Sequence, residues 1–574
     1  MNLPNIWGQG SLFAYSGLDG ETTFEKSLVG YLCGDHVGIH FVTKNQCTVY
    51  FTFAGITDVK FDIVASDIVK AVMTDKNSDI HPFEMIFKSQ NAVLFRYTDT
   101  AAPHIQFEAP VEQGGADDCV VYRSGEETFA FLKRDMGGCS IAVFAYGEHA
   151  EADAKAAFTE DINSEISKKL AFFEGLPVTK TLSGNSEKLF YKCFSVLKSM
   201  VYSPEGMFQT RWTTPDRFPH KKLWLWDSVF HSMGNQYIDI ELAKESILAV
   251  FDTQNPDGMI PHMTSPVKKS AITQPPVLAW GILELYNRTG DKEFLEKTYE
   301  PLKKYLQWNM DNRDANHNFL YEWYVEDNSV TCRCGECGMD NSPRFDNVTA
   351  MDCIDFSCFM AKEAASLSKI SEILNKSGEY LYWNVMYDRI KKAVNTYLYD
   401  EEDGFYYDRV LKDGKFKKVK SVASFLPLFA GICDTKQAQS LLNYLCDENE
   451  FGTPVGVPSI AVCDETFGSD MWRGPVWINY NYMIAQGLRD YGYKKKAAQL
   501  IEDTMAAMTD WYVNDGVVYE YYDSMNKVSP SRLNRKGPGI VPYQPGIKMQ
   551  DIRDYGWSCA LYVAMAMDRE RKNQ

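Results

Sequence analysis

The spacing of apolar residues changes its period once along this chain, near residue 147, and that change restricts the folds open to it. Before the change, apolar and polar residues alternate, as in residues 49–53, 59–64 and 139–147. Strict alternation places one face of a strand on a core and the other in solvent. Gly, Asn and Asp separate these segments at short intervals, which favours strands joined by turns. Residues 1–147 are therefore predicted to form an antiparallel β-sandwich domain.

After the change, apolar residues recur with the period of an α-helix. Residues 148–181 are rich in Ala, Lys and Glu and are predicted to form a helical linker. Further on, sets such as Leu189, Cys193 and Val196 share one helical face, which indicates packed helices. The helical segments recur as hairpins without a close sequence repeat, which disfavours a solenoid. Residues 182–574 are therefore predicted to close into an all-α toroid, an (α/α)6 barrel.

The charge of the chain excludes several classes of partner. Its formal net charge is -18, whereas nucleic-acid binding needs a surplus of Lys and Arg. An anionic membrane surface is disfavoured for the same reason, and no apolar run approaches the length that spans a bilayer. The sequence favours a small carbohydrate substrate over nucleic acid or membrane, and it does not indicate an oligomeric state.

The expected location is the cytoplasm. The first residues contain no basic stretch followed by an apolar one, so that no secretory signal is predicted. The 14 cysteines are accordingly expected to be mostly free thiols.

Four parts of the helical region contain Trp, Asp, His, Arg and Gly where a helix core would contain Leu and Ala. Long polar and aromatic loops at one end of a toroid are where a site is expected. The parts are residues 221–234 with 254–266, residues 272–281, residues 336–346, and residues 469–488 with 516–524.

Four short motifs in these parts occur in the order typical of glycoside hydrolase family 63. They are Trp-Asp-Ser at 226–228, Gly-Met-Asp-Asn-Ser-Pro at 338–343, Trp-Arg-Gly-Pro at 472–475 and Tyr-Glu-Tyr at 519–521. The chain resembles this family, whose clan also holds the trehalases, from about residue 182 to about 566. A β-domain in front of the barrel is also usual for the family. The resemblance implies an inverting, metal-independent, exo-acting α-glycosidase without a cofactor, with an α-glucoside as the expected substrate.

Glycoside hydrolysis of this kind needs two carboxyl groups, one that protonates the leaving oxygen and one that activates water. Asp340 lies in an irregular loop between Gly338 and Pro343, and the resemblance makes it the general acid. The resemblance makes Glu520 the general base. An inverting enzyme holds the two carboxyls about 6.5 to 9.5 Å apart to admit a water. Asp346 and Glu336 flank the same loop as Asp340 and are the alternative acids.

The remaining candidates are side chains suited to the ring faces and hydroxyl groups of a sugar. Trp224 and Trp226 offer stacking faces, and Asp227 offers a carboxylate that can accept two hydroxyl hydrogen bonds. Arg473 could grip the substrate or a catalytic carboxylate, but it could equally anchor its loop through an internal ion pair. The resemblance adds further residues to the substrate site, namely His262, Gln274, Gly338, Trp472, Trp477 and Trp557.

Three cysteines just before the proposed acid, Cys332, Cys334 and Cys337, have a spacing that could supply three zinc ligands. Cys353 or a histidine could be the fourth. No second Cys-x-x-Cys accompanies them, and hydrolysis by carboxylates needs no metal. Free thiols and no bound metal are therefore predicted.

Other functions share this fold. A trehalase-like hydrolase would use the same chemistry on a disaccharide. Sugar epimerases and lyases with helical barrels rely on His or Tyr as proton carriers, and the nine histidines here are not clustered. A glycoside phosphorylase would need a phosphate pocket. A sugar-binding protein without activity would not need both carboxylates.

Overall fold

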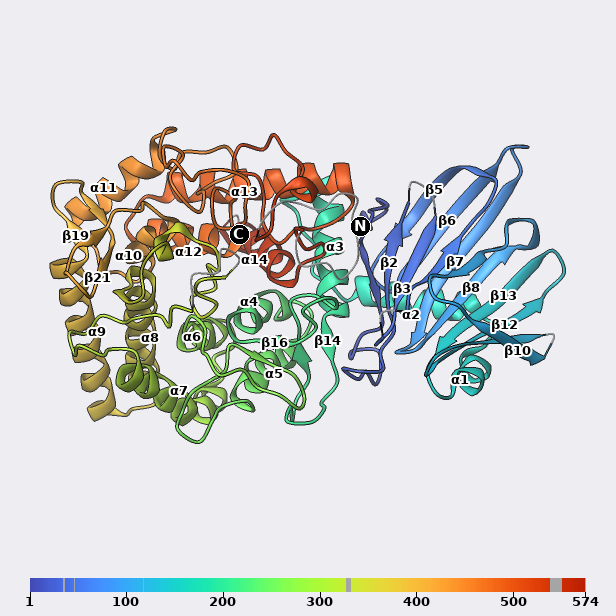
Figure 1. The fold of residues 1–574 in the computed structure, drawn as a ribbon, viewed down its shortest axis with the longest axis horizontal. Helices are drawn as coiled ribbons and strands as arrows, with labels where there is room; N and C mark the ends of the chain where they lie inside the picture. The colour runs from blue at the N-terminus through green and yellow to red at the C-terminus, as the bar shows by residue number, and fades with distance from the viewer. Residues whose placement is uncertain (35–36, 46, 117, 327–331, 537–549, 573–574) are drawn as a thin grey trace.

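The computed structural model describes the chain in two parts, a β-rich N-terminal region and a helical C-terminal region (Figure 1). This confirms the predicted order of the two kinds of structure. The described residues are 1–34, 37–45, 47–116, 118–326, 332–536 and 550–572.

The N-terminal region contains a five-stranded and an eight-stranded sheet, in which every strand pairing is antiparallel. The five-stranded sheet has the order β1 (Leu12–Ala14), β2 (Val29–Cys33), β3 (Gly38–Val42), β4 (Val49–Thr52) and β9 (His104–Phe107). The eight-stranded sheet has the order β10 (Glu112–Ala116), β11 (Cys119–Ser124), β12 (Glu127–Asp135), β13 (Cys139–Tyr146), β8 (Ala92–Thr98), β7 (Ile80–Ser89), β6 (Ile68–Asp75) and β5 (Ile56–Val64).

Aromatic residues from both sheets form the core between them. The Phe51 ring of the smaller sheet stacks on Phe95 of the larger one, with ring centroids 5.1 Å apart. Phe41 stacks on Phe144 at 5.5 Å. All four side chains are fully buried, as the alternating pattern of their strands requires.

The segment predicted as one linking helix is two helices, α1 (Ala150–Ala157) and α2 (Ile162–Glu174). Phe158 leaves the helical conformation and ends α1. The Asp161 side chain then accepts a hydrogen bond from the Ser164 backbone N–H at 3.1 Å and begins α2. An N-cap aspartate inside an otherwise helical pattern is thus the reason for the difference. α1 packs on β12 and β13 of the larger sheet.

The C-terminal region consists of helices, and every second one belongs to a closed circuit of contacts whose members are called the inner helices. The helices of the region are α3 (Asn185–Ser199), α4 (Leu225–Asn235), α5 (Ile240–Phe251), α6 (Leu278–Thr289), α7 (Lys292–Asn312), α8 (Ile354–Ile373), α9 (Ser377–Tyr397), α10 (Leu426–Phe429), α11 (Thr435–Cys446), α12 (Ile478–Asp490), α13 (Lys494–Asp515) and α14 (Gly556–Lys572). α4, α6, α8, α10, α12 and α14 each pack against the next, and α14 packs against α4. Every residue of α4 is buried, as expected of a helix surrounded by others.

A buried carboxyl group connects two of the inner helices. Glu363 on α8 is fully buried and accepts hydrogen bonds from the backbone N–H groups of Ala279 and Trp280, at 2.8 and 2.9 Å. These N–H groups lie in the first turn of α6, where they lack partners within the helix. Burial raises the pKa of Glu363 to about 7.

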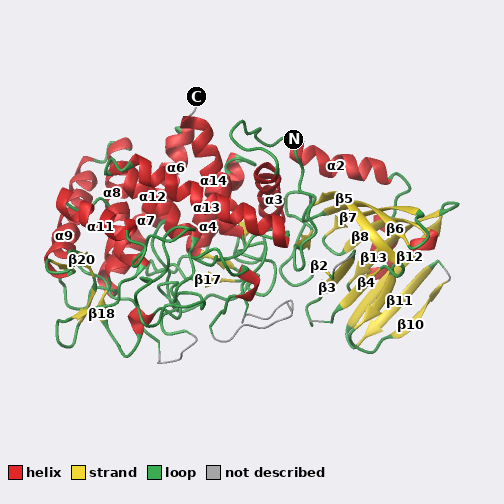
Figure 2. Cartoon of the chain, turned by 90° about the horizontal axis from the view of Figure 1, so that it is seen from above, coloured by secondary structure: helices red, strands yellow, loops and turns green. Residues whose placement is uncertain are grey.

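Long loops gather at one end of these helices (Figure 2). Residues at the start of α4, α12 and α14 lie at this end, which therefore receives the Trp-rich motifs. Within the described residues, no helix has the length and apolar character needed to cross a membrane.

Candidate active site

A pocket lies where α4, α12 and α14 begin, and it brings together nine of the twelve residues predicted for the site. Its lining consists of His220, Trp224, Trp226, Asp227, Gln274, Gly335, Gly338, Asp340, Met471, Trp477, Glu520, Arg535, Lys536, Tyr555 and Trp557. Three predicted residues, His262, Trp472 and Arg473, lie outside this lining.

The proposed acid, Asp340, reaches the pocket from the loop before the 3-10 helix Pro343–Phe345. Its carbonyl oxygen accepts a hydrogen bond from the Arg333 backbone N–H at 2.8 Å, which holds the loop. Its carboxylate pairs with the Lys536 ammonium, and 18% of the Asp340 side chain is exposed. The Asp340 carboxyl group is therefore accessible from the pocket and lies against the Lys536 ammonium.

The proposed base, Glu520, is the more deeply buried of the two carboxylates, with 4% of its side chain exposed. Its backbone N–H donates to the Ile552 carbonyl at 3.0 Å, which ties the Glu520 segment to the chain before α14. The Arg535 guanidinium donates from Nε to Oε2 at 2.9 Å and from Nη2 to Oε1 at 3.3 Å. This two-point, charge-assisted contact fixes the orientation of the Glu520 carboxylate in the pocket.

Arg535 and Lys536, consecutive in sequence, thus hold the two proposed catalytic carboxylates, one each. Burial lowers the pKa of Arg535, but the charge of Glu520 outweighs burial and the pKa is raised. The sequence analysis missed both residues. Their one sequence signal is an Arg-Lys pair in a polar loop shortly after Tyr519-Glu520-Tyr521.

Asp227 and Gln274 form a polar corner of the pocket. The Tyr555 hydroxyl donates to Asp227 Oδ1 at 3.2 Å, and the Trp226 backbone N–H donates to Gln274 Oε1 at 3.1 Å. Burial raises the pKa of Asp227 well above its ordinary value, and the nearby charge of Glu520 adds to this shift. The neutral form of Asp227 can both donate to and accept from sugar hydroxyls.

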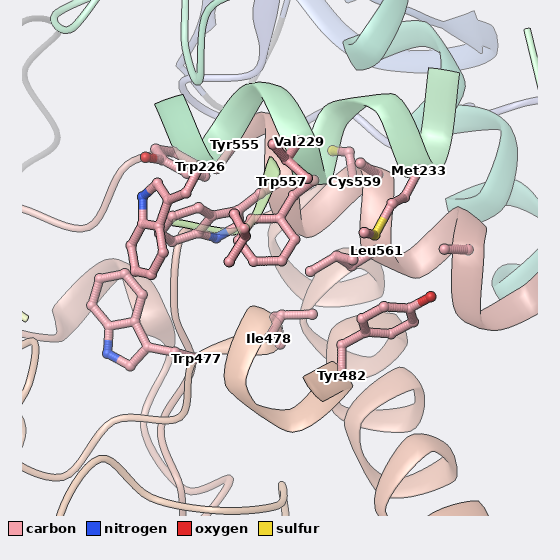
Figure 3. Packing of buried hydrophobic residues seen from close by; sticks show 14 of the residues in the cluster. Trp226, Val229, Met233, Trp477, Ile478, Tyr482, Tyr555, Trp557, Cys559 and Leu561 are labelled. Carbon is pink, nitrogen blue, oxygen red and sulfur yellow. The ribbon is translucent and has the colours of Figure 1, made fainter. Parts of the chain in front are cut away.

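Tryptophans form the apolar wall. Trp557 stands edge-on to Trp226 at 5.3 Å and to Trp477 at 5.7 Å between ring centroids (Figure 3). Trp472 lies flat against Trp477, at 3.8 Å and 4° between the ring planes, and is fully buried. Trp472 therefore supports the wall from behind.

Two histidines contact the Trp224 ring. His262 stands edge-on to it at 5.1 Å, and its Nδ1 lies 2.6 Å from the Ser270 hydroxyl. Burial lowers the pKa of His262 to about 4, so this ring is neutral near pH 7. His220, which the sequence analysis missed, also stands edge-on to Trp224, with ring centroids 5.8 Å apart, and its Nδ1 is 2.5 Å from Asp216 Oδ2.

Arg473 is engaged within the protein. Its Nη2 donates to both Asp346 oxygens, at 2.8 and 3.0 Å, and its Nε donates to the Asn341 carbonyl at 2.9 Å. These bonds brace the loop that bears Asp340. The alternative acids are also bound, Asp346 by Arg473 and Glu336 by Arg313, and neither lines the pocket.

Gly338 brings the backbone of the acid loop against the pocket wall. Its φ is +74°, and a Cβ at this position would lie 2.5 Å from Trp226 Cζ2. A glycine is needed here both for the left-handed backbone and for the close approach.

The thiols before Asp340 point to separate acceptors. Cys337 donates to the Cys334 carbonyl at 3.1 Å, and Cys332 donates to Glu326 at 3.5 Å. Burial raises the pKa of Cys334 to about 11, which keeps this thiol protonated.

In the described part of the chain, the one group of ligand atoms close enough to share a metal is Cys353, Asp355 and Asp408. The Arg344 guanidinium already bonds both of these carboxylates, in each case at 2.7 Å. The Arg344 guanidinium therefore pairs with both carboxylates of this group.

A family model of the mannosylglycerate hydrolase MGH1-like glycoside hydrolase domain matches residues 220–558. A mannosylglycerate hydrolase of Thermus thermophilus is 28% identical over 396 residues, which cover 54% of this chain and 91% of the relative. The crystal structure of a family 63 mannosylglycerate hydrolase, also from Thermus thermophilus and in complex with glucose, has a TM-score of 0.54 and 27% identity. It covers 66% of this chain and 99% of its own.

One further structure extends over both regions of the chain. A bacterial glucoamylase complexed with acarbose has a TM-score of 0.57 and covers 99% of this chain and 96% of its own. At 11% identity this likeness concerns the fold alone.

Proposed function

Because the chain belongs to the MGH1-like glycoside hydrolases of family 63, we propose that it is an inverting, exo-acting α-glycosidase of short α-linked sugars or glycosides. The observation that carries this proposal is the pocket in which Asp340 and Glu520 are both exposed to one small cavity. Each carboxylate is held by one of two consecutive cationic residues.

In the proposed reaction, protonated Asp340 gives its proton to the glycosidic oxygen as the bond to the anomeric carbon breaks. Glu520 removes a proton from a water, whose oxygen attacks the anomeric carbon from the opposite face. Arg535, which pairs with Glu520, holds its carboxylate in position for this step. Asp227, Gln274 and the tryptophan wall bind the sugar that is released.

The proposed architecture is an (α/α)6 catalytic barrel over residues 182–574, preceded by a sandwich domain over residues 1–147 and a linker over 148–181. The closed circuit of contacts through α4, α6, α8, α10, α12 and α14 supports the barrel. The aromatic core shared by the two N-terminal sheets supports the sandwich.

An α-glucoside is the first candidate substrate, and an α-glycoside with an acidic leaving group is the second. Lys536 favours the second, because its ammonium lies beside the acid on the leaving-group side of the proposed reaction. The carboxylate of a glycerate leaving group, as in mannosylglycerate, would compete for Lys536. Asp340 would then no longer be paired with Lys536 and could hold the proton that it donates in the proposed reaction.

The test is hydrolysis of a panel that contains α-linked glucose disaccharides, trehalose, α-mannosylglycerate and neutral aryl α-glycosides. Proton NMR should detect the β-anomer as the first product, and an initial α-anomer would rule out inversion. Asp340→Asn should fold normally and lose activity, since the amide cannot donate the acid proton. A variant that kept more than about a tenth of the wild-type rate would place the acid elsewhere, because general acid catalysis contributes about 10²–10⁴-fold.

A further inference from the structure

A buried carboxylate, Asp554, links the N-terminal β-region to segments that border the proposed catalytic pocket. This residue is fully buried and lies directly before Tyr555 of the pocket lining. Its φ is +52°, a left-handed conformation that costs free energy for any residue other than glycine. Such strain persists only where surrounding contacts enforce it.

Those contacts come from the start of the chain and from α3. Asp554 Oδ2 accepts hydrogen bonds from the Ser11 hydroxyl at 2.9 Å, from the Leu12 backbone N–H at 2.8 Å and from Lys192 Nζ at 2.7 Å. Leu12 is the first residue of β1, and Lys192 lies on α3. The carboxylate therefore joins the first strand of the β-region to the helical region.

The other oxygen of the same carboxylate holds the segment that bears the proposed base. Asp554 Oδ1 accepts from the Val518 backbone N–H at 3.1 Å, and the Tyr555 N–H donates to the Val518 carbonyl at 3.1 Å. Val518 is two residues before Glu520, so the pairing continues directly to the Glu520–Ile552 hydrogen bond.

A close backbone contact reinforces this connection. A Cβ at Gly8 would lie 2.6 Å from the Asp515 carbonyl oxygen and 2.7 Å from the Gly516 carbonyl carbon. The chain before β1 therefore lies directly on the turn that leads from α13 into the segment of Glu520.

We propose that Asp554 is a positioning residue for the general base, and that the N-terminal β-region serves catalysis by holding Glu520 in register through it. The inference rests on the proposed function, in which Glu520 activates water. No residue of the β-region needs to touch the substrate. Since a misplacement of about 1 Å can cost about a hundredfold in rate, loss of the connection should lower kcat and leave KM nearly unchanged.

Ser11→Ala is the first test. It removes one donor from Asp554 and one acceptor from Lys192, which keeps its ion pair with Asp554, and it leaves the proposed catalytic and sugar-binding residues in place. Its matched control is Ser195→Ala, which also removes one buried hydrogen bond between the β-region and α3, the 2.7 Å bond that Ser195 accepts from the Ser66 backbone N–H, but takes no donor from Asp554. Asp554→Asn is the stronger variant, but it also removes the negative charge that pairs with Lys192, so thermal unfolding of all variants is measured alongside the kinetics.

Ser11→Ala is expected to lower kcat about tenfold, with KM changed less than about twofold, and Ser195→Ala is expected to keep the wild-type kcat. The loss should be the same for an activated aryl glycoside and for a poor leaving group, because a defect at the base affects both. A defect at the acid would spare the activated substrate.

Glu520→Gln, assayed in parallel, distinguishes a failure of the positioning role of Asp554 from a failure of the proposed function. If Glu520→Gln abolishes hydrolysis while Ser11→Ala and Ser195→Ala have equal kcat, the positioning role is overturned and the proposed function stands. If Glu520→Gln keeps wild-type activity, the proposed base is wrong and the positioning role falls with it.

Discussion

Replacing Gly338 by alanine tests the contact between the acid loop and the pocket wall. The added Cβ would lie 2.5 Å from Trp226 Cζ2 and 2.8 Å from Cη2, whereas carbon atoms approach to about 3.5 Å. The indole must therefore move by about 1 Å, and Trp557 already packs against it edge-on. We expect about 1–2 kcal/mol for alanine in the left-handed region and a further cost of about 1–3 kcal/mol for overpacking.

Gly290→Ala is the matched control. Gly290 ends α6 with a φ of +67°, and a Cβ there meets no atom within 4 Å. The control variant therefore carries the backbone cost alone and should keep full activity. Gly338→Ala should be less stable than Gly290→Ala in denaturant unfolding, and its kcat/KM should fall at least about tenfold because both Asp340 and Trp226 shift. Equal stability and equal activity of the two variants would refute the reasoning.

Three further predictions concern charge and metal. Because burial raises the pKa of Glu363 from 4.5 to about 7, the stability it contributes is fully present below pH 4.5 and is lost as the pH rises through 7. Glu363→Gln should therefore remove up to about 3 kcal/mol of the decline in unfolding free energy between these pH values. Urea unfolding of the wild type and the variant across that range measures the decline, and an equal decline in the two proteins would contradict the prediction. EDTA and thiol-selective zinc chelators should leave kcat/KM unchanged, whereas loss of activity that zinc restores would contradict the assignment of Cys332, Cys334 and Cys337 as free thiols. Lys536→Met should lower kcat/KM for an acidic glycoside about tenfold or more relative to a neutral aryl glycoside, because a charge-assisted hydrogen bond contributes about 1.5–3 kcal/mol; an unchanged ratio would exclude Lys536 from recognition of the leaving group.

The features that could be predicted from the sequence have local signals. The change of apolar period near residue 147 corresponds to the end of β13, because periods of 2 and 3.6 reflect strand and helix geometry directly. The pocket residues Trp226, Asp227, Asp340 and Trp477 belong to motifs of unusual composition. Each motif lies at or just before the start of an inner helix or in the loop of the acid, and these starts meet at one end.

The features that could not be predicted depend on contacts between distant parts of the chain. Arg535 lies in an irregular loop, and nothing in its neighbours indicates that it turns toward Glu520. Ser11 and Asp554 are separated by 543 positions and meet only because β1 packs beside α3. The motif of Arg473 suggested either a substrate contact or an internal ion pair. The structure has the ion pair, which Arg473 makes with Asp346 across the loop that bears Asp340.

The balance of charge in the pocket bears on which leaving group it suits. Glu520 with Arg535, and Asp340 with Lys536, are two neutral pairs, and the raised pKa of Asp227 favours its uncharged form. The proposed mechanism requires Asp340 to be protonated, which would leave the Lys536 ammonium uncompensated. With a neutral leaving group, the Lys536 ammonium would remain unpaired in a partly dehydrated pocket, where an unpaired charge costs the most free energy. A leaving group with a carboxylate compensates it at the step where the acid donates its proton, so the protonation state needed for hydrolysis is the one that an acidic leaving group stabilises.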